Sequence, residues 1–157
     1  MSSTISNFRT VDQAPPASLS QGSGPSVANA RPLRVCLLIS SLEFGGAERQ
    51  VIEMTRIFDR RIIDPLICTL SDKIPLVEGD PDIRALVHTV PKHSRFDLTT
   101  ISRLASFLRK ERVDVLHAFM FDSEIAARLA APLAGVGVVI ASERNSCLLY
   151  TSPSPRD

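Results

Sequence analysis

Residues 33–145 alternate short apolar runs with longer amphipathic segments, and this alternation constrains the fold more than any other feature of the chain. The first run, LRVCLLIS, is almost continuously apolar, as expected for a strand buried on both faces of a sheet. The sequence predicts five strands, at residues 33–40, 64–70, within 83–91, 113–119 and 136–142.

Apolar side chains recur at helical spacing between these runs, in residues 51–58, 98–108 and 125–133. Strands separated by helices of this length form βαβ units, which give a parallel sheet with right-handed crossovers. The sequence therefore predicts an α/β fold, a Rossmann-like parallel sheet with flanking helices.

The two ends of the chain differ from this middle part. Residues 1–31 are rich in Ser, Ala, Pro and Gly without apolar periodicity, and we expect a disordered leader. Residues 32–145 form the predicted domain. Residues 146–157, SCLLYTSPSPRD, contain two prolines and no helical face, and we expect a tail that is disordered or foreign to the protein.

Composition excludes several classes of function. A net charge of +1 without a long basic run argues against nucleic acid as a partner. The three cysteines are far apart and form no CxxC pair, so we expect no metal site, and Cys36 and Cys68 should be ordinary buried side chains. Without a signal peptide or a span of about 20 apolar residues, the chain is predicted to be cytoplasmic, with room for peripheral contact at the inner membrane face.

Gly45 and Gly46 stand between the first predicted strand and its helix, in the segment EFGGAER. Ligands of parallel sheets bind at the carboxyl ends of the strands, and a helix N-terminus there favours a phosphate or diphosphate. A strand-to-helix turn can also need glycine for its own geometry, so both interpretations stay open. The segment is neither a GxGxxG fingerprint nor a P-loop, which argues against a nicotinamide enzyme.

Three blocks carry a resemblance to a known family. RVCLLISSLEFGGAERQVIEM, DVLHAFMFDSEIAARLAA and VGVVIASERN occur in this order within residues 33–145. Together they resemble the N-terminal domain of the retaining GT-B glycosyltransferases of family 4. The G-G-A-E segment directly after the first strand is the most specific of the three.

The resemblance implies transfer of a sugar from a nucleotide-sugar donor to an acceptor, with retention of anomeric configuration. The acceptor would be a saccharide, a lipid-linked saccharide or another hydroxyl compound, and neither a metal nor another cofactor is expected. In this family a C-terminal domain holds the donor across a cleft, and no segment of this chain matches it. We therefore expect a truncated fragment that is inactive alone.

The resemblance also points to particular residues. Gly45 and Gly46 match the glycine loop and Glu48 its acid, although Glu48 would equally suit a helix start. His117 ends the predicted strand VLHAF, where it is either a catalytic group near the sugar or a core histidine. Many family members have a second histidine where this chain has Phe119.

Three polar residues follow the last predicted strand and could bind a donor phosphate or an acceptor: Glu143, Arg144 and Asn145. A solvated loop is the alternative for them. We expect Asp122, Ser123 and Glu124 to cap the third helix and form its first turn. At the level of the whole chain, the alternative to a glycosyltransferase is a non-catalytic, flavodoxin-like binding or signalling module.

Overall fold

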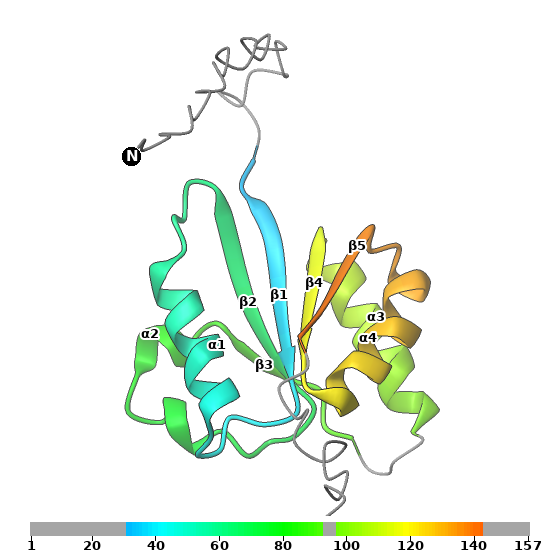
Figure 1. The fold of residues 1–157 in the computed structure, drawn as a ribbon. Coiled ribbons are helices and arrows are strands. Elements are labelled where there is room, and N and C mark those ends of the chain that lie inside the picture. The colour runs from blue at the N-terminus through cyan, green and yellow to red at the C-terminus, as the bar shows by residue number, and fades with distance from the viewer. Residues whose placement is uncertain (1–30, 93–96, 143–157) are drawn as a thin grey trace, which may run out of the picture. The chain divides into compact units, whose positions relative to one another are not determined.

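The computed structural model describes residues 31–92 and 97–142. These residues build one five-stranded sheet in which every strand pair is parallel (Figure 1). The strands are β1 (Leu33–Ile39), β2 (Ile63–Thr69), β3 (Val87–Thr89), β4 (Val115–Phe119) and β5 (Val138–Ser142). Their order is β3-β2-β1-β4-β5, so the chain changes its direction of growth between β1 and β4. The carboxyl edge beside that change is where ligands of open α/β sheets bind.

Helices cover both faces of the sheet. They are α1 (Gly46–Ile57), the short η2 (Pro75–Val77), α2 (Pro81–Arg84), α3 (Leu98–Lys110) and α4 (Phe121–Ala134). One buried cluster combines side chains of α1, η2 and α2 with one face of the sheet, and a second combines α3 and α4 with the other. The predicted fold class, a Rossmann-like parallel sheet with flanking helices, is confirmed.

Strand β1 explains why the sheet forms where it does. Its last five residues are buried, and successive side chains point to opposite faces. Cys36 and Leu38 pack with α3 and α4, whereas Leu37 and Ile39 pack with α1. An almost continuous apolar run therefore satisfies both faces at once.

Cys36 and Cys68 are free and fully buried, as predicted. They lie on neighbouring strands, since Leu38 is the register partner of Cys68. Contact with the Cys68 thiol, together with burial, raises the pKa of Cys36 well above its usual value. Cys36 is therefore a protonated, unreactive core residue at neutral pH.

Two short helices, η2 and α2, were not predicted. The sequence does contain a signal for α2, because Asp80 accepts a hydrogen bond from the Ile83 N–H and Pro81 occupies the first turn. Helix α4 also differs in detail from its expected pattern. It buries alanines against the sheet, while Ile125, Leu129 and Leu133 stay exposed.

The expected leader, residues 1–31, lies outside the described residues apart from Arg31, and the expected tail, residues 146–157, lies outside them entirely. None of the helices in the described part is long and apolar enough to cross a membrane.

Candidate functional site at the carboxyl edge of the sheet

Two serines meet where the strand order reverses. Ser40 directly follows β1, and Ser123 lies in the first turn of α4, which follows β4. Their hydroxyl oxygens are 3.4 Å apart, and Ser123 is fully buried. This contact joins residues 83 positions apart and ties β1 to α4 at the edge where a ligand would bind.

Gly45 is the N-cap of α1 and has an ordinary extended backbone, with φ −152° and ψ 173°. The Glu48 carboxylate turns back over it, because a Cβ built on Gly45 would come within 2.1 Å of Glu48 Oε2. The fold itself thus gives a reason for glycine at position 45, although a flexible carboxylate could move away from a larger side chain. The Glu48 carboxylate lies in the first turn, where the helix dipole stabilises it.

At position 46, in contrast, no contact within the fold accounts for a glycine. It is the first residue of α1, its φ is not positive, and a Cβ there would meet no atom within 4 Å. Gly45 offers no side-chain cap, so the first amide N–H groups of α1 lack a partner from that residue. The α1 terminus is therefore a set of open donors beside a backbone that a ligand can approach closely.

Met120 joins β4 to α4 in a strained conformation. Its φ of 71° and ψ of 155° fall in a region that is populated almost only by glycine. Its N–H donates to the Ser142 carbonyl at 3.1 Å, and its own carbonyl accepts from the Glu124 N–H at 3.0 Å. Such strain concentrates at functional sites, and here it lies three residues before Ser123.

His117 lies in the middle of β4 rather than at its end. Its register partners are Leu37 and Ile140, and β4 continues to Phe119. The imidazole stacks on the Phe119 ring with centroids 4.2 Å apart, and its Nε2 is 2.9 Å from Ser142 Oγ. Burial lowers the pKa of His117, so the ring is neutral at pH 7 and can donate or accept one hydrogen bond to Ser142.

Residues 44–142 match the family model for Glycosyltransferase Family 4. The chain belongs to glycosyltransferase family 4. No curated protein matches the chain. The match begins one residue before Gly45 and ends at Ser142, so it contains the glycine turn, Met120 and His117. It supports a glycosyltransferase-type function, and nothing favours the flavodoxin-like module over it.

Three predicted site residues of this family 4 domain, Glu143, Arg144 and Asn145, lie outside the described residues and just past the matched segment. The other four take two positions. Gly45, Gly46 and Glu48 lie together at the start of α1, whereas His117 projects from the face of the sheet. Within residues 31–92 and 97–142, no group of three His, Cys, Asp or Glu side chains is placed to hold a metal ion.

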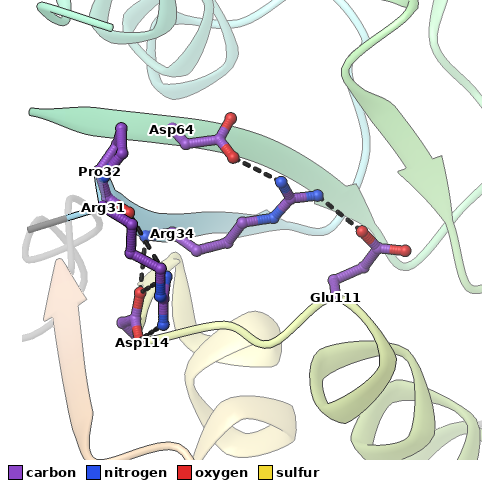
Figure 2. Close-up of polar contacts among 6 residues, drawn as sticks. All are labelled: Arg31, Pro32, Arg34, Asp64, Glu111 and Asp114. Atoms are coloured by element: carbon purple, nitrogen blue, oxygen red, sulfur yellow. Dashed lines mark hydrogen bonds and ion pairs between the residues drawn. The ribbon is translucent and has the colours of Figure 1, made fainter. Parts of the chain in front are cut away.

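The opposite, amino edge of the family 4 domain is closed by ion pairs (Figure 2). Arg34 on β1 reaches Asp64 on β2 at 2.5 Å and Glu111 at the end of α3 at 2.7 Å. Asp114, just before β4, accepts from the Arg34 N–H at 2.8 Å and from the Arg31 guanidinium at 2.7 and 2.8 Å. Every carboxylate in this network has a cationic partner, as in a structural network.

Sequence reasoning missed Ser40 and Met120, and it assigned Ser123 only to the cap and first turn of its helix. In the structure the N-cap is Met120, and Ser123 is a buried residue of the first turn that contacts β1. No local signal reveals the Ser40–Ser123 contact, because it depends on β1 and β4 being neighbours. The same holds for the positive φ of Met120.

Proposed function

We propose that the chain is the acceptor-side, N-terminal domain of a retaining GT-B glycosyltransferase, and that its glycine turn closes on the diphosphate of a nucleotide-sugar donor. Gly46 is the observation that carries this proposal. Neither its backbone conformation nor its surroundings call for glycine, and a Cβ there would point into open space. A ligand that approaches the backbone closely accounts for the missing side chain.

The chemistry of the α1 terminus suits such a ligand. Its free amide N–H groups and the positive end of its dipole both favour an anion. Glu48 occupies one side of the turn, so a diphosphate would approach from the side of Gly46. As the donor bond breaks, negative charge grows on the departing nucleotide, and fixed N–H donors stabilise that charge.

The acceptor is a saccharide, a lipid-linked saccharide or another compound that offers a hydroxyl group. In this proposal His117 acts as a neutral hydrogen-bonding group towards the sugar, because burial lowers its pKa and Ser142 holds its Nε2. Glu143, Arg144 and Asn145 would contact donor or acceptor.

A second domain supplies the remaining donor contacts in this proposal, so the 157-residue chain does not transfer sugar alone. One helix terminus leaves a diphosphate largely hydrated, and we expect dissociation constants of about 1 mM or weaker. No metal takes part in the proposed step. Steady release of nucleotide from a nucleotide sugar by the purified chain would contradict the proposal that it needs a second domain.

Gly46→Ala tests the role of the glycine turn, with Gly137→Ala as the matched control. Both glycines have open space at the Cβ position and no positive φ, but Gly137 precedes β5 at the amino edge. The probe is inorganic pyrophosphate, followed by chemical shift changes in amide spectra. We expect Gly46→Ala to weaken pyrophosphate binding at least threefold while stability rises by up to about 0.5 kcal/mol.

Gly137→Ala should leave pyrophosphate binding unchanged. Equal binding by the Gly46→Ala variant and the unmodified chain would remove the main support for the proposal. So would pyrophosphate-induced shifts that avoid residues 44–49.

A further inference from the structure

A cavity of about 410 Å³ opens between the N-terminal halves of α3 and α4, at the same edge of the sheet as the glycine turn. Its volume lies within the range of about 300–1,000 Å³ that is usual for small-molecule sites. Most of its wall is apolar, and the lining side chains that matter here are Leu98, Phe121, Ile125 and Leu129.

These four side chains are large, apolar and exposed to solvent. Leu98 is 77% exposed, Phe121 59% and Leu129 51%, although α3 and α4 pack against each other (Figure 1). For the three side chains of α4, the cause is the composition of that helix, which turns its alanines to the sheet and leaves its larger side chains outside. Four large apolar side chains around one hollow indicate a ligand-binding surface rather than scattered exposure.

The polar part of the cavity wall carries both signs of charge. Lys92 Nζ lies 3.4 Å from Asp122 Oδ2, and the Lys92 side chain is largely buried. An anionic head would compete with Asp122 for Lys92, and a cationic head would compete with Lys92 for Asp122. A hydroxyl group both donates and accepts, so it suits an ammonium and a carboxylate lying side by side.

The cavity lies next to the point where the strand order reverses. Asp122 lines the cavity, and the next residue, Ser123, contacts Ser40. On the other side, the Lys92 N–H donates to the Leu70 carbonyl at 2.8 Å, and the Leu70 N–H donates to the Ile39 carbonyl at 3.1 Å. A ligand in the cavity would therefore have its head within one residue of the Ser40–Ser123 contact.

We propose that this cavity binds the apolar tail of an amphiphile whose uncharged, hydroxyl-bearing head lies at Lys92 and Asp122, and that this amphiphile is the sugar acceptor. The identification as acceptor rests on the proposed function, whereas the binding itself does not. A single alkyl chain fits a hollow of this size and lining, and a polyol or saccharide head fits the pair of charged side chains in its wall.

Octyl glucoside, kept below its critical micelle concentration, is the probe. Binding to the full 157-residue chain is followed by calorimetry and amide spectra, with glucose and octyl phosphate as comparison compounds. We expect saturable binding of octyl glucoside, shifts at residues 98–101 and 121–129, no detectable binding of glucose and weaker binding of octyl phosphate.

Leu129→Gln removes part of the apolar wall, and Leu133→Gln is its matched control. Leu133 lies one turn further along α4 and is 56% exposed, but it does not line the cavity. Leu129→Gln should weaken octyl glucoside binding about fivefold, and Leu133→Gln should leave it within twofold. Circular dichroism of both variants shows whether they fold alike, and Asp122→Asn gives a second test at the charged part of the wall.

Several outcomes would overturn the proposal: no saturable binding, equal binding by the Leu129→Gln variant, or stronger binding of octyl phosphate. Sedimentation of the chain with uncharged lipid vesicles, without binding of monomeric octyl glucoside, would assign this surface to a bilayer instead. Pyrophosphate binding at Gly46 reports separately on the proposed function. If one of the two compounds, pyrophosphate or octyl glucoside, fails to bind, the result for the other can still be interpreted.

Discussion

The two edges of one sheet differ in how closely polar side chains connect neighbouring strands. At the amino edge, Arg34 spans β1, β2 and the end of α3 through charged side chains (Figure 2). At the carboxyl edge, where two glycines and a strained methionine lie, the Ser40 and Ser123 hydroxyls are 3.4 Å apart and the ion pairs are longer, at 3.4 Å for Lys92–Asp122 and 3.7 Å for Lys73–Glu43. At the amino edge the charged side chains form ion pairs with one another. At the carboxyl edge the first amide N–H groups of α1 and the cavity between α3 and α4 are open to a ligand.

This difference suggests a division of labour within the domain. Every parallel strand has one end at each edge, so stability can be concentrated at the amino ends without touching the residues that bind. The residues at the carboxyl edge are then free to be small or strained. Mutations at the two edges should consequently separate into those that change stability and those that change binding.

The largest effect should come from Arg34→Ala. It leaves Glu111, which is 20% exposed, and Asp64 without their cation, and we expect a loss of about 2 kcal/mol of unfolding free energy. Urea unfolding measures this loss, and pyrophosphate binding should not change. Arg56→Ala is the control, because Arg56 also bridges two carboxylates but is half exposed, so its effect should be much smaller. Equal losses would mean that the amino-edge network has no special role.

Met120 gives the next largest effect, at the carboxyl edge. Met120→Ala removes side-chain contacts and keeps the backbone strain, whereas Met120→Gly removes both. We therefore expect the glycine variant to be more stable than the alanine variant by about 1 kcal/mol, the reverse of their usual order. Thermal unfolding of the two variants decides the point. If the alanine variant is the more stable, the φ of 71° carries no strain.

Sequence patterns predicted the sheet well because the strands obey simple burial rules. β1 is buried on both faces, so an apolar run was sufficient to find it, and the glycine pair marked the candidate functional edge by its position. The predicted end of β4 at residue 119 is confirmed, whereas its start was expected at residue 113 rather than 115, and His117, expected to end the strand, lies at its centre. A continuous apolar run does not show where the first ladder hydrogen bond is made.

Other features depend on which elements become neighbours. The Ser40–Ser123 contact and the Arg34 network each join residues that are far apart in the sequence. The exposure of the large apolar side chains on α4 was not predicted, for a different reason. Helical periodicity finds apolar side chains, but it does not show that alanines rather than leucines face the sheet.

The contribution of Asp114, at the amino edge, should appear in how stability depends on pH under acid conditions. Hydrogen bonds from the Arg31 guanidinium and from the Arg34 N–H hold the pKa of Asp114 below its usual value. Its stabilising contribution is therefore complete above the unfolded-state value of about 3.9 and is lost as the pH falls through the lower folded-state value. The stability difference between the unmodified chain and Asp114→Asn should shrink below about pH 4. A difference that stays constant down to pH 2 would contradict the assigned cause.

Replacing His117 should give the smallest effect on stability. His117 lies on β4, three residues after Asp114 and nearer the carboxyl edge. Burial lowers its pKa, so the unfolded chain binds a proton at a higher pH than the folded chain does. The contribution of His117 to stability should therefore be complete above the unfolded-state pKa of about 6.5 and fall as the pH drops towards the folded-state pKa.

His117→Gln should flatten this slope, measured as the difference in unfolding free energy between pH 7 and pH 5. The other histidines are common to both proteins, so their contributions cancel. Ser142→Ala should keep the slope, because burial rather than the 2.9 Å hydrogen bond causes the shift. A slope that survives His117→Gln would place the titration on another group, and the neutral imidazole would lose its part in the proposed site.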